Sequence, residues 1–248
     1  MAVHRKVYRF RMRPTKAQEQ ALARLAGARR WVWNWALDRR KAHFAEHGAT
    51  IPAAILSAEL TALKREPETA WLAEADSQAL QQTLRDLDRA FRNFFEKRAR
   101  SPRFKSKRRD PLRFRIPQRV EVDGEHVVIP KVGRVRLRRS MDVDLPTTGA
   151  TFRRDPLGRW FVTLTAEFEM PDVELPPVSP SQVVGIDLGL KDFAVLSDGT
   201  RLPAPKFYRK AQRKLRKAQR VVSRRKPGSG RKAKARMVVA RVHQRTNN

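Results

Sequence analysis

One acidic residue stands where it could do chemistry. Asp187 lies in an apolar stretch between Ile186 and Leu188, with glycines at positions 185 and 189. A carboxylate inside a buried strand is costly unless it is paired or binds a metal. The flanking glycines leave room for a phosphate or a metal ion to approach the backbone. The pattern predicts either a metal-ligating carboxylate or a residue that shapes a turn, and taken alone it does not separate the two.

The remaining binding chemistry is cationic. The 248 residues include 55 Lys and Arg against 25 Asp and Glu, a net charge of +30. Polyanions neutralise a surface this positive, and nucleic acid is the expected one. An enzyme for a small acidic substrate does not need this excess. A basic membrane-surface protein would carry one long amphipathic cationic helix, whereas here the charge is spread along the chain.

Two stretches concentrate the positive charge. Residues 101–117 alternate basic and apolar residues and contain three prolines, so no helix is expected there. Residues 206–248 form a basic helical pattern, interrupted at 227–230, with no Asp or Glu. A solvated face is the alternative, but we expect contacts to nucleic-acid phosphates. The candidate residues are Arg103, Lys105, Lys107, Arg108, Arg109, Arg213, Lys214, Arg216, Lys217, Arg220, Arg224 and Arg225.

Composition excludes several classes of site. The chain has no cysteine, which excludes disulfides, thiol catalysis and cysteine-based zinc sites, and its five histidines alone do not predict a metal site. No apolar run approaches the roughly 18 to 20 residues of a membrane span, and the first residues lack a signal-peptide core. We expect a cytoplasmic protein, associated with the nucleoid if the source is a prokaryote.

A strand and a helical block are predicted first. Residues 3–13 alternate as a short strand with one cationic face, in which Val3, Val7 and Phe10 are the apolar members. Thr15 and Gln18 then form a capping-box pattern at the start of a long helix. Gly27 is a candidate interruption of that helix, and Gly48 and Pro52 end it. Trp31, Trp33 and Trp35 are interpreted as packing residues in preference to base-stacking ones.

Two further helices complete the block, which extends to residue 97. Residues 57–66 form a short amphipathic pattern that Pro67 stops. The strongest helix follows, with Asp76 or Ser77 as its cap. Its apolar residues recur at helical spacing, as Leu80, Leu84, Leu87, Phe91 and Phe94.

Short strands are expected from residue 101 onward. Asp123–Gly124 and the segment 155–158 are turn signals between alternating stretches, which favours a small barrel. The Pro-rich segment 171–181 is typical of a linker. Residues 183–202 then predict two consecutive hairpins, with an apolar strand at 183–188, a second strand at 193–197 and an Asp198–Gly199 turn into a third, so Asp187 is expected inside a buried strand.

Four segments in this order resemble the TnpB/OrfB family of insertion-sequence proteins. They are YRFRMRPTKAQEQAL with RRWVWNWAL, LQQTLRDLDRAFRNFF, SPRFKSKR with IPKVGRVRLR, and VVGIDLGLKDFAVLSDG. The family, long called transposases, comprises RNA-guided DNA endonucleases related to the type V CRISPR effectors. The resemblance implies an α+β multidomain fold with four parts. These are an oligonucleotide-binding-type wedge β-barrel at 1–14 and 101–175, an inserted helical recognition lobe at 15–100, a linker at 176–181, and the N-terminal part of a RuvC, RNase H-like domain with basic helices at 182–248.

The resemblance also implies partners and a metal. A guide RNA and double-stranded target DNA are the expected partners, and Asp187 matches the first catalytic carboxylate that holds Mg²⁺ or Mn²⁺ in the intact family. The family's second catalytic Glu, its paired-cysteine zinc ribbon and its final Asp do not occur before Asn248. Asp192 and Asp198 lie beside turns of the same local unit and are not expected to replace them.

We therefore expect a C-terminally truncated family member that binds nucleic acid without cleaving it and holds no zinc. Whether the chain is an enzyme stays open at this point. The alternatives are a nuclease-free, RNA-guided DNA-binding regulator, a basic RNA-binding protein, and a non-functional gene remnant. Because a lone three-stranded meander has an uncovered apolar face, residues 182–248 are expected to be loosely ordered in isolation.

Overall fold

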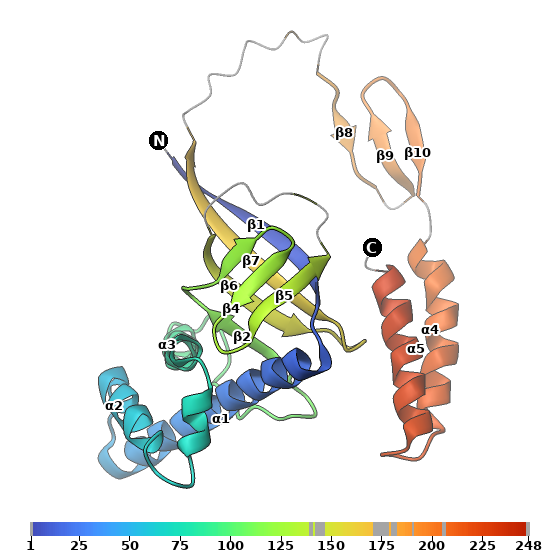
Figure 1. The fold of residues 1–248 in the computed structure, drawn as a ribbon. Helices are drawn as coiled ribbons and strands as arrows, with labels where there is room; N and C mark the ends of the chain where they lie inside the picture. The colour runs from blue at the N-terminus through green and yellow to red at the C-terminus, as the bar shows by residue number, and fades with distance from the viewer. Residues whose placement is uncertain are drawn as a thin grey trace. The chain divides into compact units, whose positions relative to one another are not determined.

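The chain divides into two units, Met1–Met170 and Pro171–Asn248. The structure is a computed structural model that describes residues 2–138, 141, 147–170, 179, 183–189, 191–204 and 207–246 (Figure 1). The linker predicted at 176–181 lies outside the described residues except for position 179. None of the described helices is long and apolar enough to cross a membrane.

A curled, seven-stranded antiparallel sheet forms the first part of the N-terminal unit (Figure 1). Its strand order is β2-β6-β7-β1-β5-β4-β3. The longest pairing joins β1 to β7, from Ala2 opposite Met170 to Arg11 opposite Phe161. No pairing joins β2 to β3 within the described ranges, so the ladder is open at these two strands. The strands are β1 Ala2–Arg13, β2 Arg113–Ile116, β3 Glu121–Asp123, β4 His126–Ile129, β5 Gly133–Arg138, β6 Thr147–Arg154 and β7 Trp160–Met170.

Alternation along the strands builds the inner face of this sheet. On β1 the buried residues are Tyr8, Phe10 and Met12, whereas Val3 and Val7 are more than half exposed. Because side chains alternate with a period of two, odd-numbered positions face away from even-numbered ones. The predicted strand is therefore confirmed, but the grouping of Val3 and Val7 with Phe10 is wrong. The hairpins predicted at Asp123–Gly124 and at 155–158 are both present.

The helices α1 (Lys16–His47), α2 (Ala53–Leu63), η1 (Ala70–Glu74) and α3 (Ser77–Phe95) form the second part of this unit. The capping box is confirmed, since Thr15 Oγ1 accepts from the Gln18 backbone N at 3.3 Å and Gln18 Oε1 accepts from the Thr15 N at 3.0 Å. Gly27 does not interrupt α1, which continues to Gly48, where a left-handed residue with φ 66° ends it.

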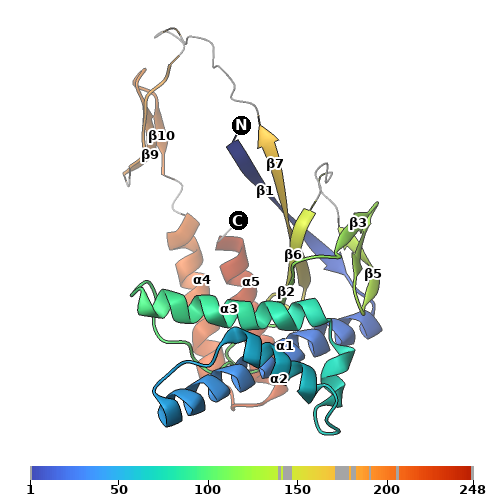
Figure 2. The same ribbon diagram turned by 90° about the vertical axis from the view of Figure 1, so that its left-hand side faces the viewer.

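The sheet and the helices share one hydrophobic core. Asp76 caps α3 by accepting from the Ala79 N at 2.8 Å, and Leu80, Leu84 and Leu87 are buried. Phe94, the last residue of the predicted stripe, is 39% exposed. Figures 1 and 2 show the helices gathered at one end of the sheet, with α3 beside α1. The division of this unit into a barrel and a separate lobe stays a prediction.

The C-terminal unit combines a small sheet with a helical hairpin. Strands β8 (Ile186–Asp187), β9 (Asp192–Leu196) and β10 (Arg201–Pro203) pair antiparallel in the order β10-β9-β8. Helices α4 (Phe207–Ser223) and α5 (Gly230–Thr246) lie side by side in both ribbon views. Ala218 on α4 and Ala235 on α5 are buried. The expectation that 182–248 is loosely ordered in isolation is not tested by this architecture.

Candidate nucleic-acid interface

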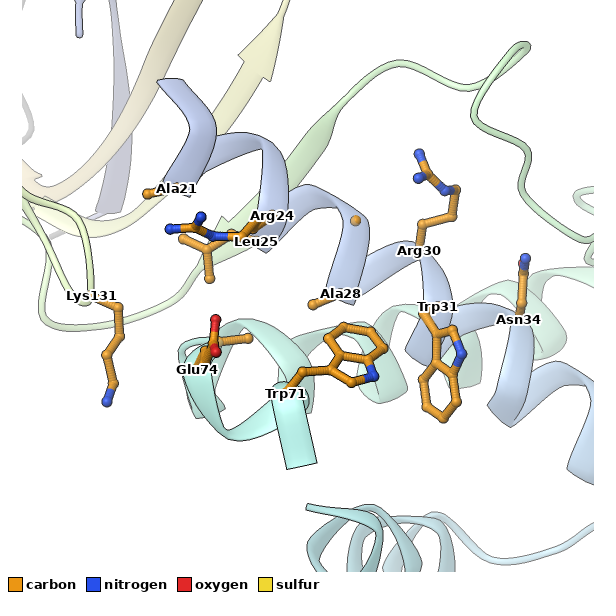
Figure 3. A pocket seen from close by; sticks show the side chains of 12 residues that line it. Ala21, Arg24, Leu25, Ala28, Arg30, Trp31, Asn34, Trp71, Glu74 and Lys131 are labelled. Atoms are coloured by element: carbon orange, nitrogen blue, oxygen red, sulfur yellow. The ribbon is translucent and has the colours of Figure 1, made fainter. Parts of the chain in front are cut away.

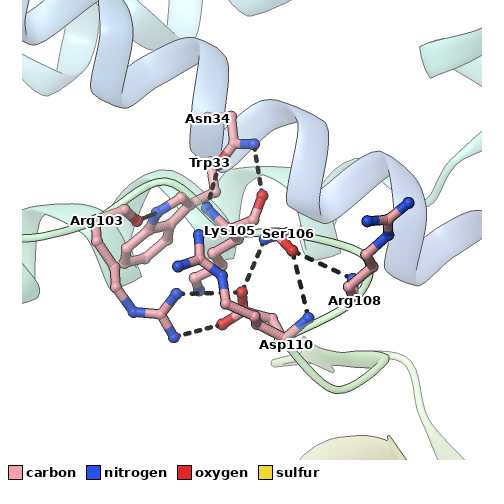
Figure 4. A network of polar contacts seen from close by, with 8 residues as sticks. Trp33, Asn34, Arg103, Lys105, Ser106, Arg108 and Asp110 are labelled. Carbon is pink, nitrogen blue, oxygen red and sulfur yellow. Dashed lines mark hydrogen bonds and ion pairs between the residues drawn. The ribbon is translucent and has the colours of Figure 1, made fainter. Parts of the chain in front are cut away.

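Helix α1 anchors the basic stretch that precedes β2. The Asn34 side chain brackets the backbone of Lys105, because its Nδ2 donates to the Lys105 O at 2.9 Å and its Oδ1 accepts from the Lys105 N at 2.7 Å. The neighbouring Trp33 Nε1 donates to the Arg103 O at 3.0 Å. Figure 4 shows these contacts reaching residues about 70 positions apart in the sequence. We call residues 103–110 the basic loop.

Asp110 organises the basic loop from within. Its carboxylate accepts from the Ser106 backbone N at 2.8 Å and from Arg103 Nη2 at 2.9 Å. Burial alone would raise the pKa of Asp110, but the hydrogen bonds from Ser106 and Arg103 outweigh it, so its pKa is lowered. The Ser106 hydroxyl accepts from the backbone N–H groups of Arg108 and Arg109. The loop is therefore a fixed turn around a charged carboxylate (Figure 4).

Lys105 is half-buried, although the sequence predicted a residue that contacts phosphates. Its Nζ lies 3.4 Å from the centroid of the Trp33 ring. Burial lowers the pKa of Lys105 to about 8, with Arg29 adding to the effect and Asp86 and Asp110 opposing it. This arrangement fixes the amine against α1 and limits its access to a ligand.

Three cations of the basic loop project outward. Lys107, Arg108 and Arg109 are exposed at its turn, and no described carboxylate pairs with them. Arg103 is exposed as well, but its guanidinium is held by Asp110. The loop thus presents three unpaired charges on a turn that Asn34 and Asp110 fix in place.

The helical hairpin α4–α5 carries the larger cationic surface. The seven candidates Arg213, Lys214, Arg216, Lys217, Arg220, Arg224 and Arg225 are all exposed. The sequence contains no Asp or Glu after Asp198, and no described carboxylate pairs with any of the seven. This surface is the main site at which the protein could neutralise a polyanion.

Asp187 does not occupy the buried position that the sequence predicted. β8 is only two residues long, and Asp187 and its neighbours Ile186 and Leu188 are exposed. The desolvation argument for a metal ligand therefore does not hold for this conformation. Mg²⁺ and Mn²⁺ sites for phosphodiester cleavage require several converging carboxylates. Among the described residues no cluster of three His, Asp or Glu could hold a metal, so these residues alone do not fit the ion.

Nearby acidic residues and glycines have local structural roles. Asp198 Oδ1 accepts from the Thr200 backbone N at 2.8 Å, and this hydrogen bond lowers the pKa of Asp198. Asp192 Oδ2 lies 3.7 Å from Arg201 Nη1. A Cβ at Gly189 would stand 3.1 Å from the Asp192 carbonyl oxygen. The glycine at 189 is thus explained by close backbone packing, without a phosphate or a metal.

Two organising residues of the basic loop were not expected from sequence. Asn34 lies on a helix whose neighbouring residues are predicted to pack in the core, and Asp110 is an acidic residue within a basic run. Asp110 followed by Pro111 carries a usable signal, because Asp before Pro favours a turn. The partnership of Asn34 with residue 105 has no signal in a single sequence, since it joins distant segments.

Two family models match the chain. Residues 165–248 match a family described as "Probable transposase", and residues 1–49 match one described as "Helix-turn-helix domain". In the structure, residues 1–49 form β1 followed by the single continuous helix α1, so two helices joined by a turn are not seen among the described residues of that range.

Longer proteins of similar sequence were found. One from Escherichia coli strain K12, named "Putative RNA-guided DNA endonuclease InsQ", is 37% identical over 239 residues, which cover 95% of this chain and 58% of that protein. Another, from Streptomyces pristinaespiralis, is named "Putative RNA-guided DNA endonuclease" and is 35% identical over 246 residues. The aligned region covers 97% of this chain and 60% of that protein. The chain therefore spans about three fifths of these relatives.

Comparison with solved structures found several matches, among them a remote one. A structure titled "Cryo-EM structure of the Cas12f1-sgRNA-target DNA complex" aligns with 98% of this chain and 65% of that chain, at 14% identity and a TM-score of 0.39. At these values the alignment does not establish a shared fold.

Proposed function

The chain belongs to the TnpB/OrfB family, and from this premise we propose that it binds a guide RNA and double-stranded target DNA. In such a system base pairing reads the sequence, while the protein holds the nucleic-acid backbone and recognises duplex shape. The longer relatives are named RNA-guided DNA endonucleases. These names support the proposal that this chain acts in an assembly of the same kind.

One observation carries the proposal: the α4–α5 hairpin exposes its predicted cations without any offsetting carboxylate. Like charges at this density repel one another, and phosphates relieve the repulsion while releasing condensed counterions. The basic loop adds Lys107, Arg108 and Arg109 on a turn that α1 holds rigidly. Rigid presentation limits the conformational entropy lost when these side chains bind.

The parts of the fold are assigned within the same proposal. The seven-stranded sheet corresponds to the wedge barrel, helices α1 to α3 to the recognition lobe, and residues from 182 onward to the first part of a RuvC-type domain. Asp187 would be one of several carboxylates that hold Mg²⁺ or Mn²⁺. Since it converges with no others among the described residues, cleavage is not assigned to these residues alone.

The salt dependence of RNA affinity tests the proposal. For the full chain, the log-log slope of the binding constant against salt should steepen by about 0.7 for each single-strand phosphate neutralised. The variant Arg213→Gln/Arg216→Gln/Arg220→Gln should flatten the slope by about 2 if all three side chains contact phosphates. A wild-type slope near zero would overturn the proposal.

A charge-matched variant controls this test. Arg5, Arg134 and Arg136 are each paired with a carboxylate, namely Glu167, Asp123 and Glu125. Replacing these three with Gln removes the same formal charge from cations that are already neutralised. The control should change the slope much less than the α4 variant. Equal changes would mean that net charge alone, and not the hairpin surface, governs binding.

A further inference from the structure

The N-terminal unit contains a pocket that none of the roles above uses. Its volume is about 680 Å³, and it lies between α1, the short helix η1 and the turn that joins β4 to β5. Figure 3 shows Trp31 and Trp71 at one end, Arg24 and Glu74 at the other, and Lys131 on the facing turn. This volume is within the range of pockets that hold small planar ligands.

An aromatic wall lines one side of the pocket. Trp71 is 42% exposed, although its indole is the largest apolar side chain of η1. Its ring centroid lies 5.8 Å from that of Trp31 in an edge-to-face arrangement, and Trp31 in turn stacks on Trp35 with an interplanar angle of 3°. The ring of Trp71 therefore packs edge-to-face against Trp31 while it stays accessible to a ligand.

Gly27 leaves the α1 side of the pocket bare. Glycine inside a helix is destabilising relative to alanine. Packing does not require it here, because a Cβ at Gly27 would meet nothing within 4 Å, and its φ is not in the left-handed region. Since Gly27 lines the pocket, the missing methyl group enlarges the space in front of the helix backbone. No contact within the fold requires a glycine here, whereas a ligand in the pocket would.

Charges on the rim fit a nucleotide. Arg24, Arg30 and Lys131 line the pocket, and none of them pairs with a carboxylate among the described residues. Glu74 follows Trp71 by three positions on a 3₁₀ helix, where side chains at i and i+3 are aligned. The carboxylate therefore stands beside the indole on the same side of η1 (Figure 3).

We propose that this pocket binds one unpaired guanine of a single-stranded RNA, with the base on Trp71, its edge toward Glu74 and its phosphates near Arg24, Arg30 and Lys131. A carboxylate accepts two hydrogen bonds side by side, and guanine presents two adjacent donors, N1–H and the N2 amino group. Uracil presents one donor between two acceptors. Unstacked RNA bases are recognised in this way, by aromatic stacking and contacts to the Watson–Crick edge. The inference rests on the proposed RNA binding.

The cations distinguish this ligand from an apolar peptide. A peptide docking on exposed Trp71 would have to desolvate three unpaired cations at the rim, which is costly without partners. RNA phosphates supply those partners. Equal binding of the two RNA strands in the test below would refute the guanine site and leave a second protein as the alternative occupant of the pocket.

Two RNA 11-mers test the inference with the full chain. One is oligouridine, and the other is the same strand with a single central guanosine. The guanosine strand should bind on the order of tenfold more tightly, as expected for a bidentate contact to one base edge. It should also quench tryptophan fluorescence more strongly, because its base stacks on an indole.

Four variants locate the effect. Trp71→Ala should weaken binding of the guanosine strand by about 5- to 150-fold. Glu74→Gln should remove the preference for guanosine while leaving affinity for oligouridine near that of the wild type. Gly27→Ala should weaken guanosine binding while raising the thermal midpoint, so a binding defect cannot be attributed to unfolding. Phe95→Ala removes an aromatic side chain that lies on α3 and is 69% exposed. This control should change neither guanosine binding nor the thermal midpoint.

The outcomes separate this inference from the proposed function. If both strands bind with steep salt dependence but equally, and Glu74→Gln changes nothing, the guanine pocket is refuted and RNA binding stands. If neither strand nor longer RNA binds, the proposed function fails, and the pocket assignment fails with it. A preference for guanosine that survives Trp71→Ala and Gly27→Ala would place the base elsewhere and also overturn the inference.

Discussion

Replacing Lys105 with methionine should stabilise the N-terminal unit at neutral pH. The side chain keeps its length against Trp33 but loses a charge that burial disfavours. A pKa of about 8, against the ordinary 10.5, sets an upper limit of roughly 3 kcal/mol on the cost of the charge. Partial exposure and attraction to the ring face reduce this cost, so Lys105→Met should gain about 1–2 kcal/mol at pH 7.

The sign of the pH dependence follows from the direction of the shift. Between about pH 8 and pH 10.5 the unfolded chain keeps a proton on Lys105 that the folded protein has released. Stability of the wild-type protein therefore rises with pH across this window. The gain in the free energy of unfolding from Lys105→Met should be complete below pH 8 and should shrink toward pH 10.

Denaturant unfolding of both proteins at pH 7 and pH 10 measures this difference, and titration of the Lys105 amine by NMR measures the pKa directly. Lys107→Met, an exposed substitution two residues away, controls for loss of a charge in the same loop. An advantage of equal size at both pH values, or a measured pKa at or above 10.5, would refute the reasoning. The indole face would then stabilise the cation more than burial destabilises it.

Three further predictions concern the scaffold. Asp110→Asn should lower stability at pH 7 by about 1–3 kcal/mol, because Ser106 and Arg103 lose a charged acceptor. Since the pKa of Asp110 is lowered in the fold, the wild type should lose this advantage as the pH falls below about 4, and acid unfolding of both proteins measures it. Leu80→Ala should cost about 2–5 kcal/mol in denaturant unfolding, because Leu80 is fully buried in the core shared by sheet and helices; a smaller loss would place it outside that core. Thr15→Ala should cost about 0.5–2 kcal/mol through loss of the capping box, whereas Thr15→Ser should stay near the wild type in the same measurement.

Local signals predicted most of the elements. The capping box at Thr15, the Asp76 cap and the Asp123–Gly124 turn each depend on residues that are near one another in the sequence. Each is confirmed. The break of the basic helical run at 227–230 is likewise confirmed, by the end of α4 and the start of α5. The predicted ends of the helices were less accurate, since α2 begins at Ala53, four residues before the predicted start.

The misplaced residues depended on long-range contacts. Gly27 was a candidate interruption of α1, but the helix continues through it, and its neighbours Leu25, Ala26 and Ala28 are buried in the core. Lys105 was predicted to contact phosphates, but Asn34 holds its backbone against α1 and its amine lies over the Trp33 ring. Asp187 was expected in a buried strand, yet β8 has only β9 as a neighbour within the described residues. A single sequence does not encode such partners in any local pattern.

Ultraviolet crosslinking of the full chain to its copurifying RNA most directly tests whether the two cationic surfaces hold RNA. Crosslinked peptides identified by mass spectrometry should come from the basic loop, where Phe104 is 40% exposed, and from α4 around Arg213 to Arg225. Absence of copurifying RNA, or crosslinks confined to the outer face of β1 and β7, would contradict the assignment of these surfaces to nucleic-acid binding.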